Sequence, residues 1–257
     1  MTTEQPVTSD EATPPTSRDA AFWAKNVTTL KLGEVPPEAV NLNVSGRRVV
    51  GPVQGFGKMW QKTMRVELTG ADVAPAEVIK TWKAEFQRFW PPRNWFYAPL
   101  EGIAPGEVAL LNLGLPGRMK LSTGVLVLYA DDESFTLMTP EGHMLAGWIT
   151  FSAEARDGVT VAQIQALERT NDPLYELGYI LGGNRLNSRF WAQTAENLAR
   201  HLGVAEPEVV SQVVCVDRRR QWRRAGNVFK NAAVRTFLWT LGTPVRRLIT
   251  RRRALDP

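Results

Sequence analysis

The sequence has one cysteine, Cys215, and two histidines, His143 and His201, among 257 residues. A single cysteine excludes an intramolecular disulfide and is typical of a cytoplasmic protein. With two distant histidines it forms no ligand spacing for zinc. No G-x-S-x-G motif is present, and Cys215 lies in a valine-rich run, so a hydrolase triad is not indicated. We therefore identify no catalytic residue, metal ligand or cofactor.

Long apolar runs and nucleotide-binding loops are also missing. No apolar run reaches the roughly 18 residues of a membrane-spanning helix. The N-terminus lacks the basic and apolar regions of a secretory signal. Gly55 and Gly57 precede a strand pattern rather than linking a strand to a helix, so they do not indicate a phosphate-binding loop. The sequence therefore lacks the usual signatures of integral membrane proteins and of nucleotide-binding enzymes, and neither class is indicated.

The charge is unevenly distributed along the chain. The net charge is +5, but residues 217–257 hold 12 of the 31 basic residues and only 2 of the 26 acidic ones. A mildly acidic body is therefore followed by a strongly basic tail, which favours an anionic partner for the tail. Composition predicts four segments: a disordered tail (1–20), an irregular lead-in (21–57), a folded domain (58–203) and a basic strand and helix extension (204–257).

In the folded segment, the spacing of the apolar residues changes once, from helical spacing to alternation. Residues 74–90 carry an apolar stripe at helical spacing, which ends at Pro91 and Pro92. Alternating stretches then predict strands, joined by short turns such as Asp157-Gly158, and short turns require antiparallel neighbours. A last helix is expected over 189–203. The predicted strands cover residues 59–70, 94–100, 106–114, 120–130, 134–140, 143–154 and 159–169.

One strand, a helix, an antiparallel meander and a terminal helix predict an α+β fold. This order resembles the helix-grip fold of the START and polyketide-cyclase-like superfamily. The stretches LYADDESFTLMTPEGHMLAGWITFSAE and RTNDPLYELGYILGG are similar to an uncharacterised bacterial branch of it. The resemblance implies a curved antiparallel sheet wrapped around a long C-terminal helix, with a hydrophobic cavity between them. It carries no catalytic motif onto numbered positions.

A cavity of that kind would be lined by aromatic and polar side chains. Gln163 and Gln165 alternate with small apolar residues, so they either face the cavity or, as we favour, face solvent. Trp148 and Thr150 alternate against Ile149 in the same way. We do not interpret Glu168 as a general acid, because such a role needs a perturbed acid in a cleft and the sequence shows none around it. The candidate cavity residues are Trp82, Phe86, Tyr97, Trp148, Thr150, Gln163, Gln165, Phe190 and Thr194.

The basic tail leaves several interpretations open. A strand is expected over 209–217 and a helix over 227–242. The tail either packs on the body with solvated arginines, lies on an anionic membrane surface through residues 218–253, or binds a protein partner; nucleic acid is disfavoured because no recognised motif accompanies the arginines. The candidate surface residues are Arg218, Arg219, Arg220, Arg223, Arg224, Arg246, Arg247, Arg251, Arg252 and Arg253.

These patterns predict a protein that binds or carries a hydrophobic small molecule or lipid, with a tail that contacts membrane. Two alternatives stay open, a cyclase- or hydrolase-like enzyme of the same superfamily and a structural interaction protein without a ligand. A polar cluster in the cavity would favour the enzyme, and a wholly apolar cavity would favour carriage. The sequence does not separate the three.

Overall fold

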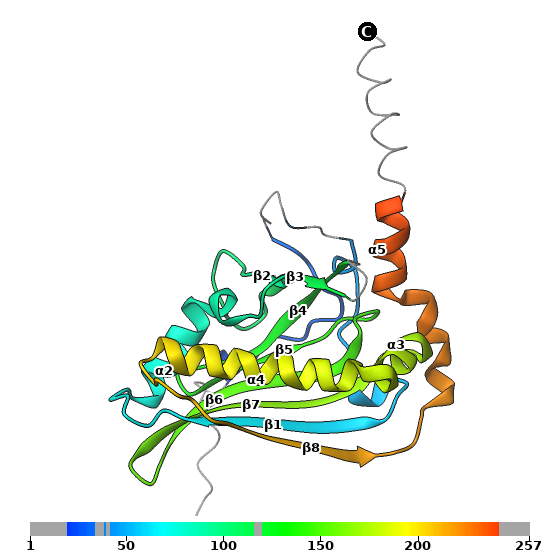
Figure 1. The fold of residues 1–257 in the computed structure, drawn as a ribbon. Coiled ribbons are helices and arrows are strands. Elements are labelled where there is room, and N and C mark those ends of the chain that lie inside the picture. Colours follow the sequence, from blue (N-terminus) through cyan, green and yellow to red (C-terminus); the bar gives the residue numbers. More distant parts are fainter. Residues whose placement is uncertain (1–19, 34–38, 40–41, 116–119, 242–257) are drawn as a thin grey trace, which may run out of the picture.

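The computed structural model describes residues 20–33, 39, 42–115 and 120–241. The predicted disordered tail therefore lies outside the described residues, except for Ala20. An eight-stranded antiparallel sheet in the order β2-β3-β4-β5-β6-β7-β1-β8 curves around the long helix α4 (Figure 1). The predicted α+β helix-grip fold is confirmed. The strands are β1 (Met59–Glu67), β2 (Trp95–Tyr97), β3 (Val108–Gly114), β4 (Lys120–Ala130), β5 (Ser134–Met138), β6 (Leu145–Arg156), β7 (Val159–Thr170) and β8 (Val209–Asp217).

The helices lie mostly between strands β1 and β2 and after β7. Pro75 occupies the first turn of α2, and the expected single helix over 74–90 is divided at Glu85, whose φ of −118° leaves the helical range. The helix that we expected over 189–203 is α4, and it begins at residue 184, earlier than expected. The helices are η1 (Pro52–Gln54), α2 (Pro75–Ala84), η2 (Phe86–Phe89), α3 (Pro173–Gly178), the π-helical turn η4 (Tyr179–Gly183), α4 (Asn184–His201), η5 (Trp222–Lys230) and α5 (Ala232–Leu241).

The sheet has an inner face, covered by α2 and α4, and an outer face. On the inner face, Ala162 and Ile164 of β7 and Phe151 of β6 join one core cluster with α2 and α4. On the outer face, a second cluster forms where Leu30 and Val44 of the lead-in pack over β3 and β4. The alternation of each strand decides which residues reach which face.

The turn between β6 and β7 shows why the meander is antiparallel. Asp157 and Gly158 both adopt positive φ, 50° and 80°, as the two central residues of a type I′ turn do. Every residue from Leu145 to Arg156 then finds a partner on β7. The continuous register places Ala153 of β6 opposite Ala162 on the inner face.

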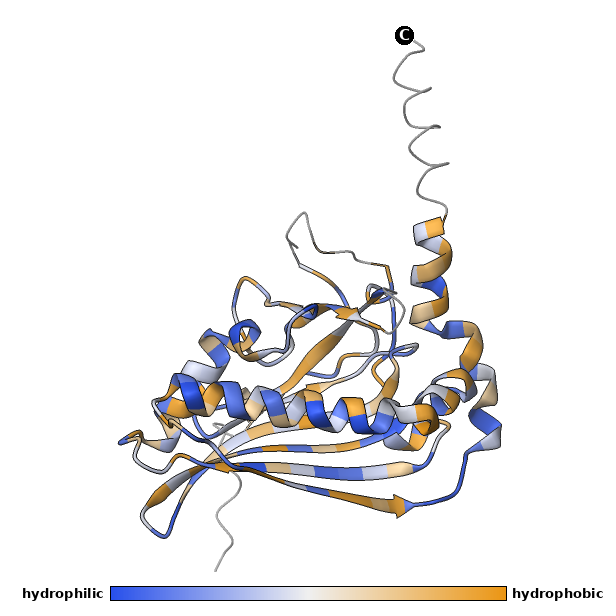
Figure 2. Cartoon of the chain, in the orientation of Figure 1, coloured by the Kyte–Doolittle hydropathy of each residue, from blue (hydrophilic) through white to orange (hydrophobic). Residues whose placement is uncertain are grey.

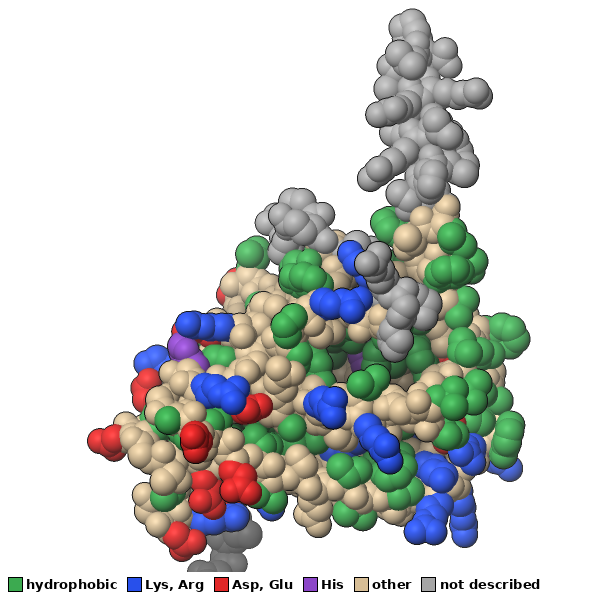
Figure 3. Space-filling model, viewed as in Figure 1, with side chains coloured by type: hydrophobic (Ala, Val, Ile, Leu, Met, Phe, Trp, Pro, Cys, Tyr) green, Lys and Arg blue, Asp and Glu red, His purple; other side chains and the backbone are tan. Residues whose placement is uncertain are grey.

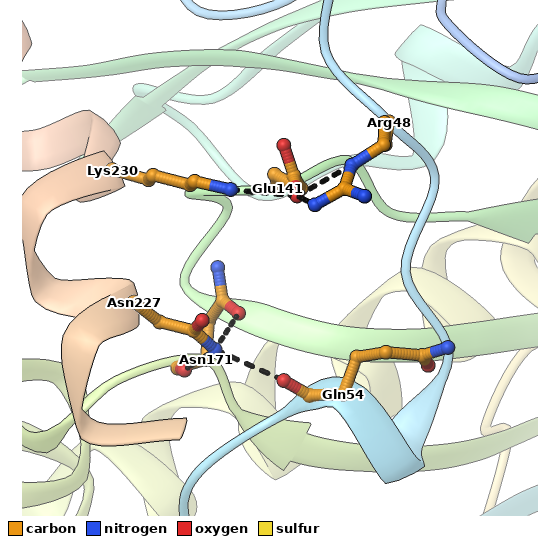
Figure 4. Close-up of polar contacts among 6 residues, drawn as sticks. All are labelled: Arg48, Gln54, Glu141, Asn171, Asn227 and Lys230. Carbon is orange, nitrogen blue, oxygen red and sulfur yellow. Dashed lines mark hydrogen bonds and ion pairs between the residues drawn. The ribbon is translucent and has the colours of Figure 1, made fainter. Parts of the chain in front are cut away.

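The C-terminal extension is joined to the sheet and to the lead-in. β8 pairs with β1 from Val209 to Asp217. Beyond it, the side-chain amide of Asn227 donates to the carbonyl oxygens of Gln54 and Asn171, at 2.9 and 2.8 Å. Lys230 and Arg48 both contact Glu141 (Figure 4). The tail therefore packs on the body through η5, and the expected helix over 227–242 is divided at residue 231 into η5 and α5.

Candidate functional site

A cleft of about 430 Å³ opens between the start of β1 and the turn that joins α3 to α4. Its volume lies in the range of small-molecule sites, roughly 300–1,000 Å³. Its lining combines apolar side chains, two cations and several polar groups. The lining residues are Lys58, Trp60, Glu176, Tyr179, Ile180, Leu181, Gly182, Asn184 and Arg185.

The cleft depends on the irregular turn between α3 and α4. Asp172 caps α3, because its carboxylate accepts from the backbone N–H groups of Leu174 and Tyr175. The chain then leaves regular helical geometry in η4, where Gly182 has a φ of 127° that favours glycine. π-helical turns inside helices are frequent at functional sites. Here the turn contributes Tyr179 to the cleft wall.

A buried polar network stands directly behind this wall. The ammonium of Lys62, which has no exposed side-chain surface, donates to the Tyr179 hydroxyl and to Asn187 Oδ1, each at 2.6 Å. It also pairs with Glu168 at 3.0 Å, and the Tyr179 hydroxyl donates to the same carboxylate at 2.5 Å. The backbone carbonyl oxygen of Asn184 lies 3.4 Å away as a further acceptor. The three ammonium hydrogens are therefore fully partnered, as a buried lysine requires.

Burial dominates the electrostatics of this network. It lowers the pKa of Lys62, and the neighbouring Glu168 carboxylate opposes that effect. Burial first, and then the negative charge of Glu168, raise the pKa of the Tyr179 hydroxyl well above its usual value. The phenol is therefore a protonated donor at neutral pH.

A second polar group connects the cleft wall to the basic tail. Glu176 accepts a hydrogen bond from the Thr170 hydroxyl at 2.7 Å and pairs with Arg220 at 2.9 Å. Gly57 is needed beside it, because a Cβ there would lie 2.0 Å from the Thr170 hydroxyl oxygen and 2.1 Å from the Glu176 carboxylate. Arg220 is thus half-buried in an ion pair rather than free on the surface.

Asn184 supplies a polar group without a partner in the described part of the chain. Its side-chain oxygen is buried and receives no hydrogen bond there. Buried acceptors are normally satisfied, so this oxygen is an exception within a residue of the cleft lining.

Two apolar residues of the cleft lining, Ile180 and Leu181, are exposed and belong to a wider set of exposed apolar side chains on α3, η4 and η5. Figure 3 shows hydrophobic side chains gathered over α3, η5 and α5, with basic side chains nearby. Large exposed hydrophobic patches on soluble proteins commonly mark interaction sites. We call the following exposed residues the apolar rim: Leu177, Ile180, Leu181, Trp222 and Phe229.

The predicted cavity residues do not surround one space. Trp82, Phe86, Phe190 and Thr194 lie between the sheet and the helices, where aromatic rings fill the interior. Trp82, for example, contacts Phe151 with ring centroids 5.2 Å apart. The sheet separates these four from the other five.

Tyr97, Trp148, Thr150, Gln163 and Gln165 lie on the outer face. Their neighbours in sequence occupy the inner core, so alternation turns these five side chains outward. The Thr150 hydroxyl contacts that of Thr136 at 2.9 Å, and Gln163 accepts from Arg65 at 2.6 Å. The strand period therefore places the nine candidates on opposite faces of the sheet, and Gln163 and Gln165 point outward, which is the orientation that we favoured.

Sequence reasoning did not identify Lys62, Tyr179, Asn184 or Asn187, and it gave no role to Glu168, which is buried against Lys62. One signal was present for Lys62: it shares the parity of Trp60, Met64 and Val66, so it is a charged residue on the inner face of β1.

The structure places the candidate arginines unequally. Arg220 pairs with Glu176, and the backbone carbonyl of Arg219 accepts from buried Arg169 at 2.7 Å. Arg218, Arg223 and Arg224 are exposed, as is the side chain of Arg219. Arg246, Arg247, Arg251, Arg252 and Arg253 lie outside the described residues.

No family model matches this sequence, and no curated protein matches it. Among solved structures, protein Ms6760 from Mycobacterium smegmatis is similar, with 14% identity, a TM-score of 0.40, and coverage of 57% of this chain and 91% of that one.

Two further similar structures come from plant and biosynthetic proteins. The major latex-like protein 151 of Panax ginseng has 10% identity and a TM-score of 0.37, covering 58% of this chain and 100% of its own. The di-domain ARO/CYC StfQ of the steffimycin biosynthetic pathway has 10% identity and a TM-score of 0.43, covering 57% and 53%. Such low scores add no ligand or reaction, and the helix-grip architecture rests on the strand order and α4 of this chain.

Proposed function

We propose that this protein binds an amphiphilic small molecule, such as a single-chain lipid, in the cleft beside η4. The observation that carries the proposal is the lining itself: Trp60, Ile180 and Leu181 offer apolar surface, while Lys58 and Arg185 offer positive charge. An apolar chain with an anionic head group matches both features.

Calorimetric titration with three probes of equal chain length tests this preference: dodecyl phosphate, dodecanol and dodecyltrimethylammonium. We expect the phosphate to bind most tightly and the ammonium most weakly. The double variant Lys58→Glu/Arg185→Glu should remove the preference. Lys80→Glu on α2, an exposed lysine paired with Glu77, is the matched control. Equal affinity for the three probes would count against the proposed site.

We also propose that the apolar rim and the exposed arginines contact an anionic membrane surface. Within the described residues, no helix has the length and apolarity to cross a bilayer. The rim instead has the composition of a surface-binding element, with Trp222 and Phe229 in the same segment as Arg223 and Arg224. Each arginine near an anionic surface contributes on the order of 1 kcal/mol. Because Ile180 and Leu181 belong to both rim and cleft, a bound rim would open the cleft toward the lipids.

Vesicle cosedimentation separates the charge from the apolar contribution. Binding to phosphatidylcholine vesicles should increase when phosphatidylserine is included and should fall with added salt. Arg223→Glu/Arg224→Glu should abolish the dependence on phosphatidylserine, and Ile180→Asp/Leu181→Asp should weaken binding to both compositions. Leu100→Asp, at a residue with 79% exposure away from the rim, is the control. Binding unaffected by either double variant would contradict the membrane contact.

The enzyme alternative has one supporting observation, the hydroxyl of Tyr179 held between Lys62 and Glu168 directly behind the cleft wall. A protonated phenol beside a ligand is a possible proton donor in general acid catalysis. Mass analysis of a bound ligand before and after incubation separates the two functions. Carriage returns the ligand unchanged, whereas an enzyme converts it and loses that conversion in Tyr179→Phe.

A further inference from the structure

β8 forms an open edge of the sheet. It is the last strand in the order, and in the part of the chain that the structure describes no strand lies beyond it. Val210 is 65% exposed, and Val213, Val214 and Val216 are 39–45% exposed. Figure 2 shows hydrophobic colouring toward the arrowhead of β8. A nine-residue apolar strand is therefore left with one edge unpaired.

This edge has few of the features that usually protect an edge strand. Natural edges are short, or carry lysine, proline or inward-pointing charges. The opposite edge, β2, has three residues, whereas β8 has nine and no charge before Asp217. Its pairing with β1 is irregular only at the end, next to Met59 and Trp60. An unprotected edge of this length and composition is a template for another strand.

The charges at the two ends of β8 indicate which strand fits. Glu206 and Glu208 precede the strand and Arg218 follows it, and all three are exposed. When two copies pair antiparallel about Val213, Arg218 of one copy lies opposite Glu208 of the other, and this contact occurs twice by symmetry. Parallel pairing would instead place like charges together.

We propose that the protein forms a homodimer in which the β8 strands of two copies pair antiparallel about a two-fold axis near Val213. The two sheets then form one continuous sheet. Val213 of one copy then meets Val213 of the other, and Val210 meets Val216 on either side of the axis, as β-branched residues do in stable cross-strand pairs. This inference does not depend on ligand or membrane binding.

Light scattering of the full chain after size exclusion measures the association. The wild-type protein should have twice the mass of one chain. Val213→Lys and Val213→Glu should each be monomeric, because each places identical charges against each other at the axis. An equimolar mixture of the two variants should regain the dimer mass. Val53→Lys, at a 69% exposed valine outside the sheet, should stay dimeric.

The mixture separates loss of the interface from loss of the fold, since misfolded variants would not recover by mixing. A monomeric wild-type protein would overturn the proposal. Dimeric Val213→Lys would also overturn it, because association would then use another surface. A mixture that stays monomeric would equally contradict the placement of the axis near Val213.

Discussion

Replacing Lys62 with methionine should be among the most destabilising single substitutions in the protein. Lys62 is fully buried and bonded to Tyr179, Asn187 and Glu168. Methionine keeps an unbranched chain but removes the charge, which leaves the Glu168 carboxylate buried without a cation. Breaking a buried ion pair in this way costs about 3–5 kcal/mol. This is a large part of a total stability of roughly 5–15 kcal/mol.

The assay is urea unfolding supported by calorimetry. A loss of that size lowers Tm by roughly 6–20 °C for a chain of this length. Lys62→Met/Glu168→Gln should recover much of the loss, because neither partner is then charged. Lys80→Met removes an exposed pair with Glu77 and should cost at most about 1 kcal/mol. If Lys62→Met costs no more than Lys80→Met, the reasoning about the network is refuted.

Three further substitutions test other parts of the structure. Burial lowers the pKa of His143 to about 4. The unfolded chain therefore binds the proton more tightly than the folded one. The free energy of unfolding then falls by up to about 1.4 kcal/mol per pH unit as the pH drops from 6.5 toward 4. Urea unfolding of His143→Gln should show a shallower fall, and a slope equal to wild type would contradict the burial. Gly57→Ala should lower Tm because its Cβ displaces the Glu176 side chain. The control Gly226→Ala, where a Cβ meets open space, should leave Tm unchanged. Equal effects on Tm would be inconsistent with close packing at Gly57. Asn227→Ala should speed hydrogen exchange across η5 and α5. The control Phe229→Ala, at an 88% exposed side chain, should not change it. Unchanged exchange in Asn227→Ala would mean that the Asn227 amide does not fix the tail.

The sequence predicted the strands well, because alternation is a local signal. The expected strands over 120–130 and 209–217 coincide with β4 and β8. The turn at Asp157-Gly158 followed from the conformations that those two residues favour. The start of α4 was placed too late, at residue 189 instead of 184, and Gly182 and Gly183 before it lie in a kinked π-helical turn.

The candidate site was less accessible to sequence reasoning. A parity argument for β1 would have placed Lys62 on the inner face with Met64. Nothing local indicated that η4 turns Tyr179 toward Lys62, because a π-helical turn shifts the helical period unpredictably. Trp82 and Phe86 were expected to line a cavity, but their rings pack against Phe151 and fill the interior there.

The central claim is that the cleft beside η4 holds an amphiphile, and native mass spectrometry of the full chain purified from its host tests it most directly. We predict an adduct of lipid-like mass on the wild-type protein. Ile180→Glu, which places an anion in the cleft lining, should lose the adduct, and Val53→Glu should keep it. A wild-type spectrum with the bare chain alone, or an adduct that Ile180→Glu retains, would contradict the account.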